Sequence, residues 1–216
     1  MLLAGALLSV GIGLVAGYVV RTVWPAGGML ATLLLWLGML VPVLFAYSRS
    51  RPVGLLKLRP ADLLYGVVFG VGLRVIKGAL SAADGDSRFP TLTTVDGSLA
   101  SGWWFIDLIA PVLVAPLIEE FFFHGLVLVV LYNVLRRPLG MRTAGLVGWL
   151  VTLALFVFVH AAVGETSTST VVSLALLAAV CGMLVLFTGR IWGAVLVHVG
   201  YNAALTGLSL VGTVLA

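Results

Sequence analysis

Three short stretches of the sequence carry carboxylate, imidazole and amide side chains inside otherwise apolar runs. The stretches are EEFFFHG, FVFVH and HVGYN, and their polar residues are Glu119, Glu120, His124, His160, His198 and Asn202. An apolar environment disfavours the charged form of a carboxylate, so a buried glutamate can take a proton from water. Imidazole and amide groups can donate hydrogen bonds to the oxyanion that forms when this water attacks a carbonyl group. Together these residue types favour hydrolysis of a peptide bond by an activated water molecule.

The spacing of the two glutamates predicts different roles for them. Glu120 and His124 are four residues apart, so their side chains share one helical face and can form a hydrogen bond. Glu119 points about 100° away from Glu120 around the helix. We therefore expect Glu120 to be held by His124 and Glu119 to remain available for chemistry.

The two later stretches add groups from other helices. His198 and Asn202 share a helical face, and Gly200 between them permits another helix to approach closely. Phe156 lies one turn before His160 and can form an apolar wall beside the imidazole. We expect these side chains to meet the glutamates in one cavity.

The elements that carry these residues are those of a membrane protein. Of the 216 residues, 62% are hydrophobic and 9% are charged, whereas soluble domains have roughly 25% charged residues. A helix that crosses a bilayer takes roughly 20 apolar residues. Such runs occupy residues 2–20, 29–47, 61–80, 103–135, 144–163, 171–188 and 191–214. The composition predicts an all-α fold, a polytopic transmembrane helical bundle of about seven spans in the lipid bilayer.

The fourth run, residues 103–135, is too long for one perpendicular helix. Pro111 and Pro116 offer breaks. We expect a kinked or tilted helix whose first part lies at the membrane interface, anchored by Trp103 and Trp104.

The histidines of the fifth and seventh runs differ in predicted depth. With straight helices, His160 lies towards the outer end of its span and His198 towards the inner end, on the order of 15 Å apart. A shared cavity therefore requires tilt, shifted boundaries or a shortened helix.

The basic residues predict the orientation of the chain. With the N-terminus in the cytoplasm, most of them fall in loops on the cytoplasmic side: Arg49, Arg51, Lys57, Arg59, Arg136, Arg137, Arg142 and Arg190. The positive-inside rule then predicts a multi-pass protein of the plasma (inner) membrane with a cytoplasmic N-terminus. Arg21 and the acidic, polar stretch SAADGDSRFPTLTTVDGS would face outward. The basic residues are scattered over helix ends and form no continuous stripe, so no nucleic-acid partner is predicted.

The placement of the ionisable residues also points to function. The three histidines fall inside predicted spans, and Glu165 is the glutamate that lies in a loop. A charged side chain at the centre of a transmembrane helix costs roughly 2.5–3.5 kcal/mol, so such residues usually face a protein interior or a water-filled cavity. The single cysteine, Cys181, lies in an apolar run and is interpreted as a small core residue.

In this order on successive spans, EEFFFHG, FVFVH and HVGYN resemble the three motifs of the CAAX protease and bacteriocin-processing family of intramembrane proteases, also called the CPBP or Abi family. The family pattern is Glu-Glu-x-x-x-Arg, then Phe-x-x-x-His, then His-x-x-x-Asn or a similar ending. The resemblance covers residues 103–212. It implies one membrane domain with catalytic core helices at residues 103–216 and a variable part at residues 1–102, made of N-terminal helices and an outward loop.

The resemblance also implies roles for the polar residues. Glu119 would activate the water, and Glu120 would be the second, orienting acid. His160, His198 and Asn202 would position the water and stabilise the oxyanion. The implied substrate is a peptide or membrane protein.

His124 stands where the family motif has an arginine. A histidine four residues after Glu120 makes a single, pH-dependent contact, whereas an arginine would fork onto the carboxylate. Three interpretations remain open: a tolerated variant that still pairs with Glu120, an additional metal ligand, or an inactive, scaffold-like homologue.

A metal cofactor is compatible with the same residues. Imidazoles and carboxylates are suitable zinc ligands, and Glu119, His160 and His198 are the candidates for a zinc site with an open water position. A glutamate-dependent and a metal-dependent peptidase both fit the resemblance, so no cofactor is assigned from the sequence.

Two other classes of protein also place polar residues inside spans. An ion-coupled transporter does so, but such transporters commonly consist of two repeated halves, and the sequence contains no visible repeat. A non-catalytic membrane immunity or assembly factor is the other alternative. An intramembrane endopeptidase accounts best for the three ordered motifs.

Overall fold

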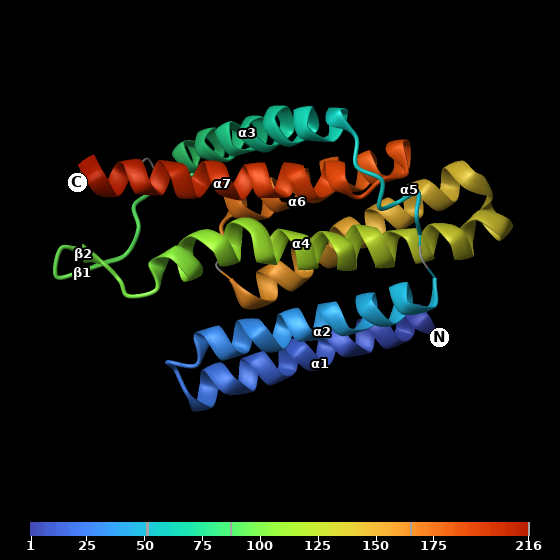
Figure 1. Cartoon of the computed structure of the whole chain (residues 1–216), viewed down its shortest axis with the longest axis horizontal. Helices are drawn as coiled ribbons and strands as arrows, with labels where there is room; N and C mark the ends of the chain where they lie inside the picture. The colour runs from blue at the N-terminus through green and yellow to red at the C-terminus, as the bar shows by residue number, and fades with distance from the viewer. Residues whose placement is uncertain (51, 87, 165, 216) are drawn as a thin grey trace.

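The protein folds into a bundle of long helices (Figure 1). The structure is a computed structural model that describes residues 1–50, 52–86, 88–164 and 166–215. In chain order the elements are α1 (Leu2–Val23), α2 (Gly28–Arg49), α3 (Pro60–Ala83), β1 (Thr94–Val95), β2 (Ser98–Leu99), the π-helix η1 (Trp104–Val114), α4 (Ala115–Glu120), the π-helix η2 (Phe121–Leu128), α5 (Val129–Val163), α6 (Thr168–Thr188) and α7 (Trp192–Leu215). Arg51 and Glu165, which were predicted to lie in loops, are outside the described residues. The predicted all-α fold is confirmed, with a short antiparallel hairpin of β1 and β2 added to it.

The count of membrane spans depends on one glycine. In the described part of the chain, six helical stretches are long and apolar enough to cross a membrane, and one of them, Trp104–Val163, has 60 residues. Within it, Gly140 has a φ of 76° and a ψ of 163°, which are not helical values. Figure 1 shows the chain reversing direction in this yellow region. The stretch therefore supplies two crossings, in agreement with about seven spans in a multi-pass membrane protein.

The expected kink in the fourth run takes the form of π-helical turns around two prolines. Pro111 lies inside η1 and has no N–H to donate to the carbonyl of Asp107, four residues earlier. The N–H of Ala115 donates to the carbonyl of Ala110, which is five residues back instead of four. Pro116 opens α4, and a second π-helix follows it. The two wide segments therefore flank the short helix that carries the paired glutamates.

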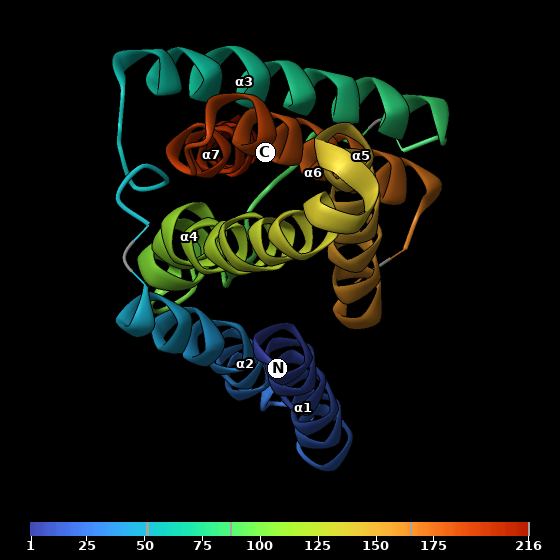
Figure 2. The same cartoon turned by 90° about the vertical axis from the view of Figure 1, so that its right-hand side faces the viewer.

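The helices are arranged in layers (Figure 2). α1 and α2 pack on each other as a hairpin at one side of the bundle, and α3 lies on α7 at the other side. α4 and its flanking π-helices lie between these two pairs. Trp103 and Trp104 stand at the start of η1, and Trp104 is exposed.

Glycines set the distances between paired helices. A Cβ atom at Gly38 of α2 would lie 2.7 Å from the carbonyl oxygen of Ser9 in α1. A Cβ atom at Gly200 of α7 would lie 2.6 Å from the carbonyl oxygen of Gly66 in α3. The close helix approach predicted at Gly200 is therefore confirmed.

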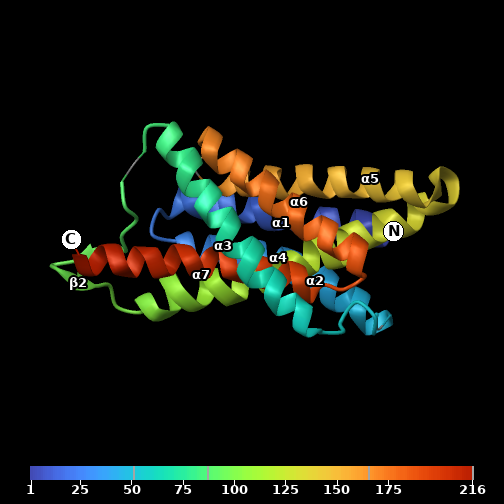
Figure 3. The same ribbon diagram turned by 90° about the horizontal axis from the view of Figure 1, so that it is seen from above.

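The straight-helix estimate of depth does not hold, because His160 and His198 reach the same carboxylate oxygen, at 3.3 and 3.9 Å. The turn between α6 and α7 is recessed. Ile191 in this turn is fully buried, and its N–H donates to the carbonyl of Leu55. The turn at Gly140 extends beyond it at the same end of the bundle (Figure 3). α7 therefore begins deeper in the bundle than the second half of α5, which brings the two imidazoles level.

We expect Gly200→Val to destabilise the protein and Gly207→Val to leave its stability nearly unchanged. Both glycines are on α7, but a Cβ at Gly207 meets no described atom within 4 Å, whereas at Gly200 it meets the backbone of Gly66. Overpacking of this kind costs about 1–3 kcal/mol. Thermal unfolding of the two purified variants in detergent measures the difference. Equal unfolding midpoints would contradict the close contact of α3 and α7.

Candidate active site

Glu120 is a fully buried carboxylate shared by two histidines. Nδ1 of His124 lies 2.6 Å from its Oε2 atom, and Nδ1 of His198 lies 2.9 Å from its Oε1 atom. Each imidazole N–H donates to one carboxylate oxygen. The contact with His124 is the one that the four-residue spacing predicted. The contact with His198 joins α4 to α7 across 78 residues of sequence.

These two hydrogen bonds offset the cost of burying Glu120. A buried carboxylate is tolerated when charge-assisted hydrogen bonds satisfy its oxygens. They also orient His198, because its Nδ1 atom is committed to Glu120 and its Nε2 atom faces the other glutamate. Both oxygens of Glu120 thus accept hydrogen bonds from imidazoles, and the carboxylate fixes the position of His198.

Glu119 lies beside two imidazole nitrogens. Its Oε2 atom is 3.3 Å from Nε2 of His160 and 3.9 Å from Nε2 of His198. This oxygen is buried and has no hydrogen-bond partner among the described residues. Nδ1 of His160 lies 2.9 Å from the carbonyl oxygen of Phe156. A carbonyl can only accept, so Nδ1 carries the proton of that bond and a neutral His160 turns the lone pair of Nε2 towards Glu119.

Phe156 packs against the imidazoles. Its ring is stacked on the ring of His160 with a centroid distance of 4.2 Å, and it meets the ring of His198 at 5.9 Å. Phe123 contacts its other side at 5.0 Å, and Phe156 is fully buried. The apolar wall predicted beside His160 is present and also borders His198, so both rings are held by packing as well as by hydrogen bonds.

Asn202 joins α7 to η1. Its Nδ2 atom donates to the carbonyl oxygen of Pro111 at 2.7 Å. The residue five positions after Pro111 is Pro116, which has no N–H, so the π-helix cannot satisfy this carbonyl itself. One turn along α7, the hydroxyl of Thr206 donates to the carbonyl of Asp107 at 3.3 Å. The role of Asn202 as an oxyanion donor stays a prediction.

Thr206 was not identified from the sequence, although a signal for it existed. It lies four residues after Asn202 on the same face of α7, and Asp107 lies four residues before a proline. Prolines remove the α-helical donor to the carbonyl of Asp107 and the π-helical donor to the carbonyl of Pro111, and two side chains one turn apart on α7 contact these carbonyls.

The metal hypothesis is not supported by the arrangement of the side chains. Glu119, His160 and His198 approach one another, but among the residues that the structure describes no group of three or more His, Cys, Asp and Glu side chains is arranged to hold a metal ion. The Nε2 atom of His124 is buried without a hydrogen-bond partner, and its Nδ1 atom is occupied by Glu120.

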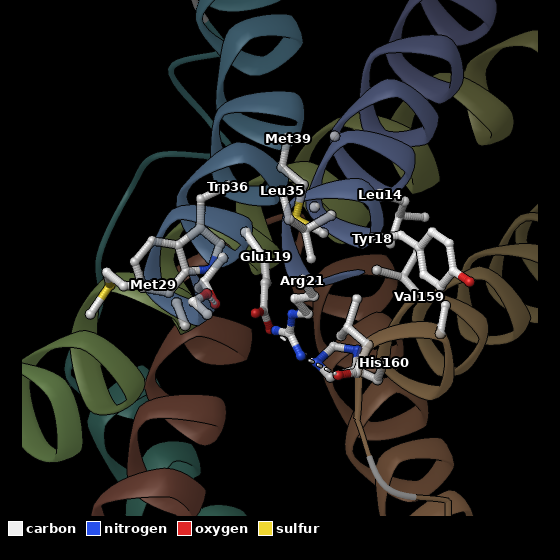
Figure 4. Close-up of a pocket in the computed structure, with 18 of the residues that line it drawn as sticks. Leu14, Tyr18, Arg21, Met29, Leu35, Trp36, Met39, Glu119, Val159 and His160 are labelled. Atoms are coloured by element: carbon white, nitrogen blue, oxygen red, sulfur yellow. Dashed lines mark hydrogen bonds and ion pairs between the residues drawn. The ribbon is translucent and has the colours of Figure 1, made fainter. Parts of the chain in front are cut away.

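A cavity of about 660 Å³ borders Glu119 and His160 (Figure 4). α1 and α2 line one side of it, and η1, α4 and the end of α5 line the other. Arg21 also lines this cavity. The sequence indicated Arg21 as an outward-facing residue at a helix end and gave no reason to connect it with the glutamates.

The fold and the site define a polytopic helical membrane protein with a buried glutamate and histidine centre open to a cavity between its helices. Residues 101–204 match the family model of the type II CAAX prenyl endopeptidase Rce1-like proteins. This match confirms, for that part of the chain, the resemblance to the CAAX protease and bacteriocin-processing family. No curated protein and no solved structure matches the chain.

We expect Glu120→Gln to destabilise the fold more than Glu119→Gln does. An amide at position 120 loses the charge that holds two imidazole N–H groups, and hydrogen bonds to charged groups contribute about 1.5–3 kcal/mol each. Oε2 of Glu119 has no such partner among the described residues, so less is lost there. Thermal unfolding of both variants measures their order. A larger loss in Glu119→Gln would contradict the positioning role of Glu120.

Proposed function

We propose that the protein is an intramembrane endopeptidase in which Glu119 activates the water that attacks a peptide bond. One observation carries the proposal: Glu119 lines a cavity, and its Oε2 atom lies 3.3 and 3.9 Å from the Nε2 atoms of His160 and His198. The match of this region to an endopeptidase family supports the same class of reaction.

The first step is removal of a proton from water. Oε2 of Glu119 is an acceptor, and so are the Nε2 atoms of His160 and His198 while their Nδ1 atoms carry the ring protons. A water molecule among these atoms can donate both hydrogens and direct a lone pair at the carbonyl carbon of the substrate. Glu119 takes one proton as the new C–O bond forms, and the carbonyl oxygen becomes an oxyanion.

The second step is breakage of the C–N bond. The proton that Glu119 accepted can pass to Nε2 of His160, which is 3.3 Å away. An imidazolium at this position can donate that proton to the leaving nitrogen, which departs as an amine and leaves a carboxylic acid. The second amide N–H of Asn202 is the proposed donor to the oxyanion, and the neutral His198 positions the water through Nε2.

The two parts of the membrane domain are proposed to cooperate in this reaction. Residues 103–216 would form the catalytic core, and residues 1–102 would form the N-terminal helices and an outward loop. The lining of the cavity supports this cooperation, since Leu35 and Arg21 come from the first part and Glu119 and His160 come from the second.

We expect Glu119→Gln to lower the rate of peptide cleavage by at least about 100-fold, because general-base catalysis contributes about 10²–10⁴-fold. The assay uses purified protein in detergent, a mixture of quenched fluorescent apolar peptides, and a buffer that contains a metal chelator. Thr152→Val is the matched control, because Thr152 is fully buried on α5 and its hydroxyl has no hydrogen-bond partner among the described residues.

Thr152→Val is expected to retain the wild-type rate. Full activity of Glu119→Gln would reject the catalytic role of Glu119. Activity that requires metal and disappears in chelator would reject the metal-free mechanism. No cleavage of any peptide by the wild-type protein would favour a non-catalytic membrane factor instead.

The orientation of the chain in the plasma (inner) membrane is proposed from its charges, with the N-terminus cytoplasmic. The described basic residues of the 52–59 segment, the turn at Gly140 and the turn at Gly189 lie at one end of the bundle, where the N-terminus also lies (Figures 1 and 3). The positive-inside rule assigns this end to the cytoplasm. The turn between α1 and α2 would then be on the non-cytoplasmic side.

We expect an impermeant thiol reagent added to intact cells to label Ala26→Cys and not Arg137→Cys. Ala26 is exposed in the turn between α1 and α2, and Arg137 is exposed near the turn at Gly140. The native Cys181 is fully buried, so the unmodified protein is the control for background labelling. Lysis should allow labelling of both variants. The reverse pattern in intact cells would invert the proposed orientation.

A further inference from the structure

The cavity beside Glu119 combines apolar walls with one cationic side chain. Its volume of about 660 Å³ lies within the range of about 300–1,000 Å³ that is usual for ligand pockets. Gly13, Gly17 and Ala31 of the α1 and α2 hairpin contribute small, apolar surfaces to one wall of the cavity. Among the lining residues that the structure describes, Arg21 is the basic residue other than histidine. The cavity can therefore accept an extended apolar segment with an anionic group at one end.

Arg21 has donors to offer to such a group. One guanidinium nitrogen donates to the carbonyl of Val163 at 3.3 Å, at the end of α5. A guanidinium has five N–H groups, so this bond leaves most of them available. Within the described residues Arg21 forms no ion pair with Glu119, although both line the same cavity. Figure 4 shows Arg21, Glu119 and His160 around that space.

Three aromatic rings pack together beside the glutamates and do not line this cavity. The ring of Phe121 contacts the ring of Tyr47 at 5.8 Å and the ring of Trp192 at 6.0 Å. The hydroxyl of Tyr47 also donates to the carbonyl of Gly125 at 3.3 Å, which ties α2 to η2. These contacts lie on the side of the glutamates that leads to the basic end of the bundle. The lining of the cavity extends from Glu119 towards the opposite end, which is therefore the route that we assign to a peptide.

The open end is the one that carries the turn between α1 and α2. Arg21 is in the last turn of α1, Gly28 begins α2, and Val163 ends α5, and all three line the cavity. With the proposed orientation, this end faces the non-cytoplasmic side of the membrane.

We propose that the cavity binds an apolar peptide segment presented from the non-cytoplasmic side, and that Arg21 pairs with a carboxylate of that peptide. The inference rests on the proposed function and names its substrate class. An arginine and a carboxylate form a charge-assisted, often bidentate pair, which fixes the position of the peptide relative to Glu119. The carboxylate can come from an acidic side chain or from the C-terminus of the peptide.

Peptide binding to the Glu119→Gln protein tests the proposal without requiring cleavage. The probes are one fluorescent apolar peptide with a free C-terminus, the same peptide with an amidated C-terminus, and the amidated peptide with one Asp or one Asn. We expect the free acid or the Asp peptide to bind about tenfold more tightly than its uncharged counterpart, since a hydrogen bond to a charged group is worth about that factor. The peptide that gains affinity identifies the source of the carboxylate.

Adding Arg21→Gln to this protein should remove the difference, and Arg21→Glu should favour a Lys peptide over the Asp peptide. Arg49→Gln is the matched control, because Arg49 lies at the other end of α2 over the ring of Phe45 and is expected to leave the preference unchanged. Equal binding of charged and uncharged peptides, or a preference that survives Arg21→Gln, would overturn the inference. Failure of the proposed function has a different signature, since wild-type protein would then bind peptides and leave all of them uncut.

Discussion

The carboxylate of Glu120 is the constraint on which the rest of the site depends. Burying it without partners would cost far more than the protein can tolerate, so an imidazole N–H must meet each of its oxygens. His124 is supplied by the same helical stretch, four residues later, but His198 must come from α7. Burial of this one charge therefore requires α4 and α7 to pack at a fixed register. The same register turns Nε2 of His198 towards Glu119.

The prolines extend this coupling to the helix before the glutamates. Each proline removes one N–H from η1 and α4, and each missing N–H leaves a carbonyl without its usual donor. Asn202 and Thr206 supply two of the missing donors from α7. The helix that carries Glu119 is thus weakened in its own hydrogen bonding and depends on α7 for compensation. One face of α7 therefore contacts both the carboxylate of Glu120 and the backbone that precedes Glu119.

Local spacing made some of these features predictable. The pair of Glu120 and His124 follows from the helical period, and the wall formed by Phe156 follows in the same way. The matching depth of His160 on α5 and His198 on α7 did not follow, because hydropathy gives the length of a helix and not its depth in the bundle. The burial of Ile191 against the segment before α3 sets that depth, and no local pattern encodes it. The bond from Asn202 to Pro111 depends on both facts, since it needs the register of α7 and the missing N–H of Pro116.

Histidine at position 124 contacts one oxygen of Glu120, where the family motif has an arginine. An arginine forks onto a carboxylate with two parallel N–H bonds, one to each oxygen. His124 donates to Oε2 and leaves Oε1 for His198. Sharing the carboxylate in this way gives His198 a fixed tautomer, with the lone pair of Nε2 directed at Glu119 when the ring is neutral. The departure from the family motif is therefore compatible with an oriented imidazole at His198, which faces Glu119 as the proposed mechanism requires.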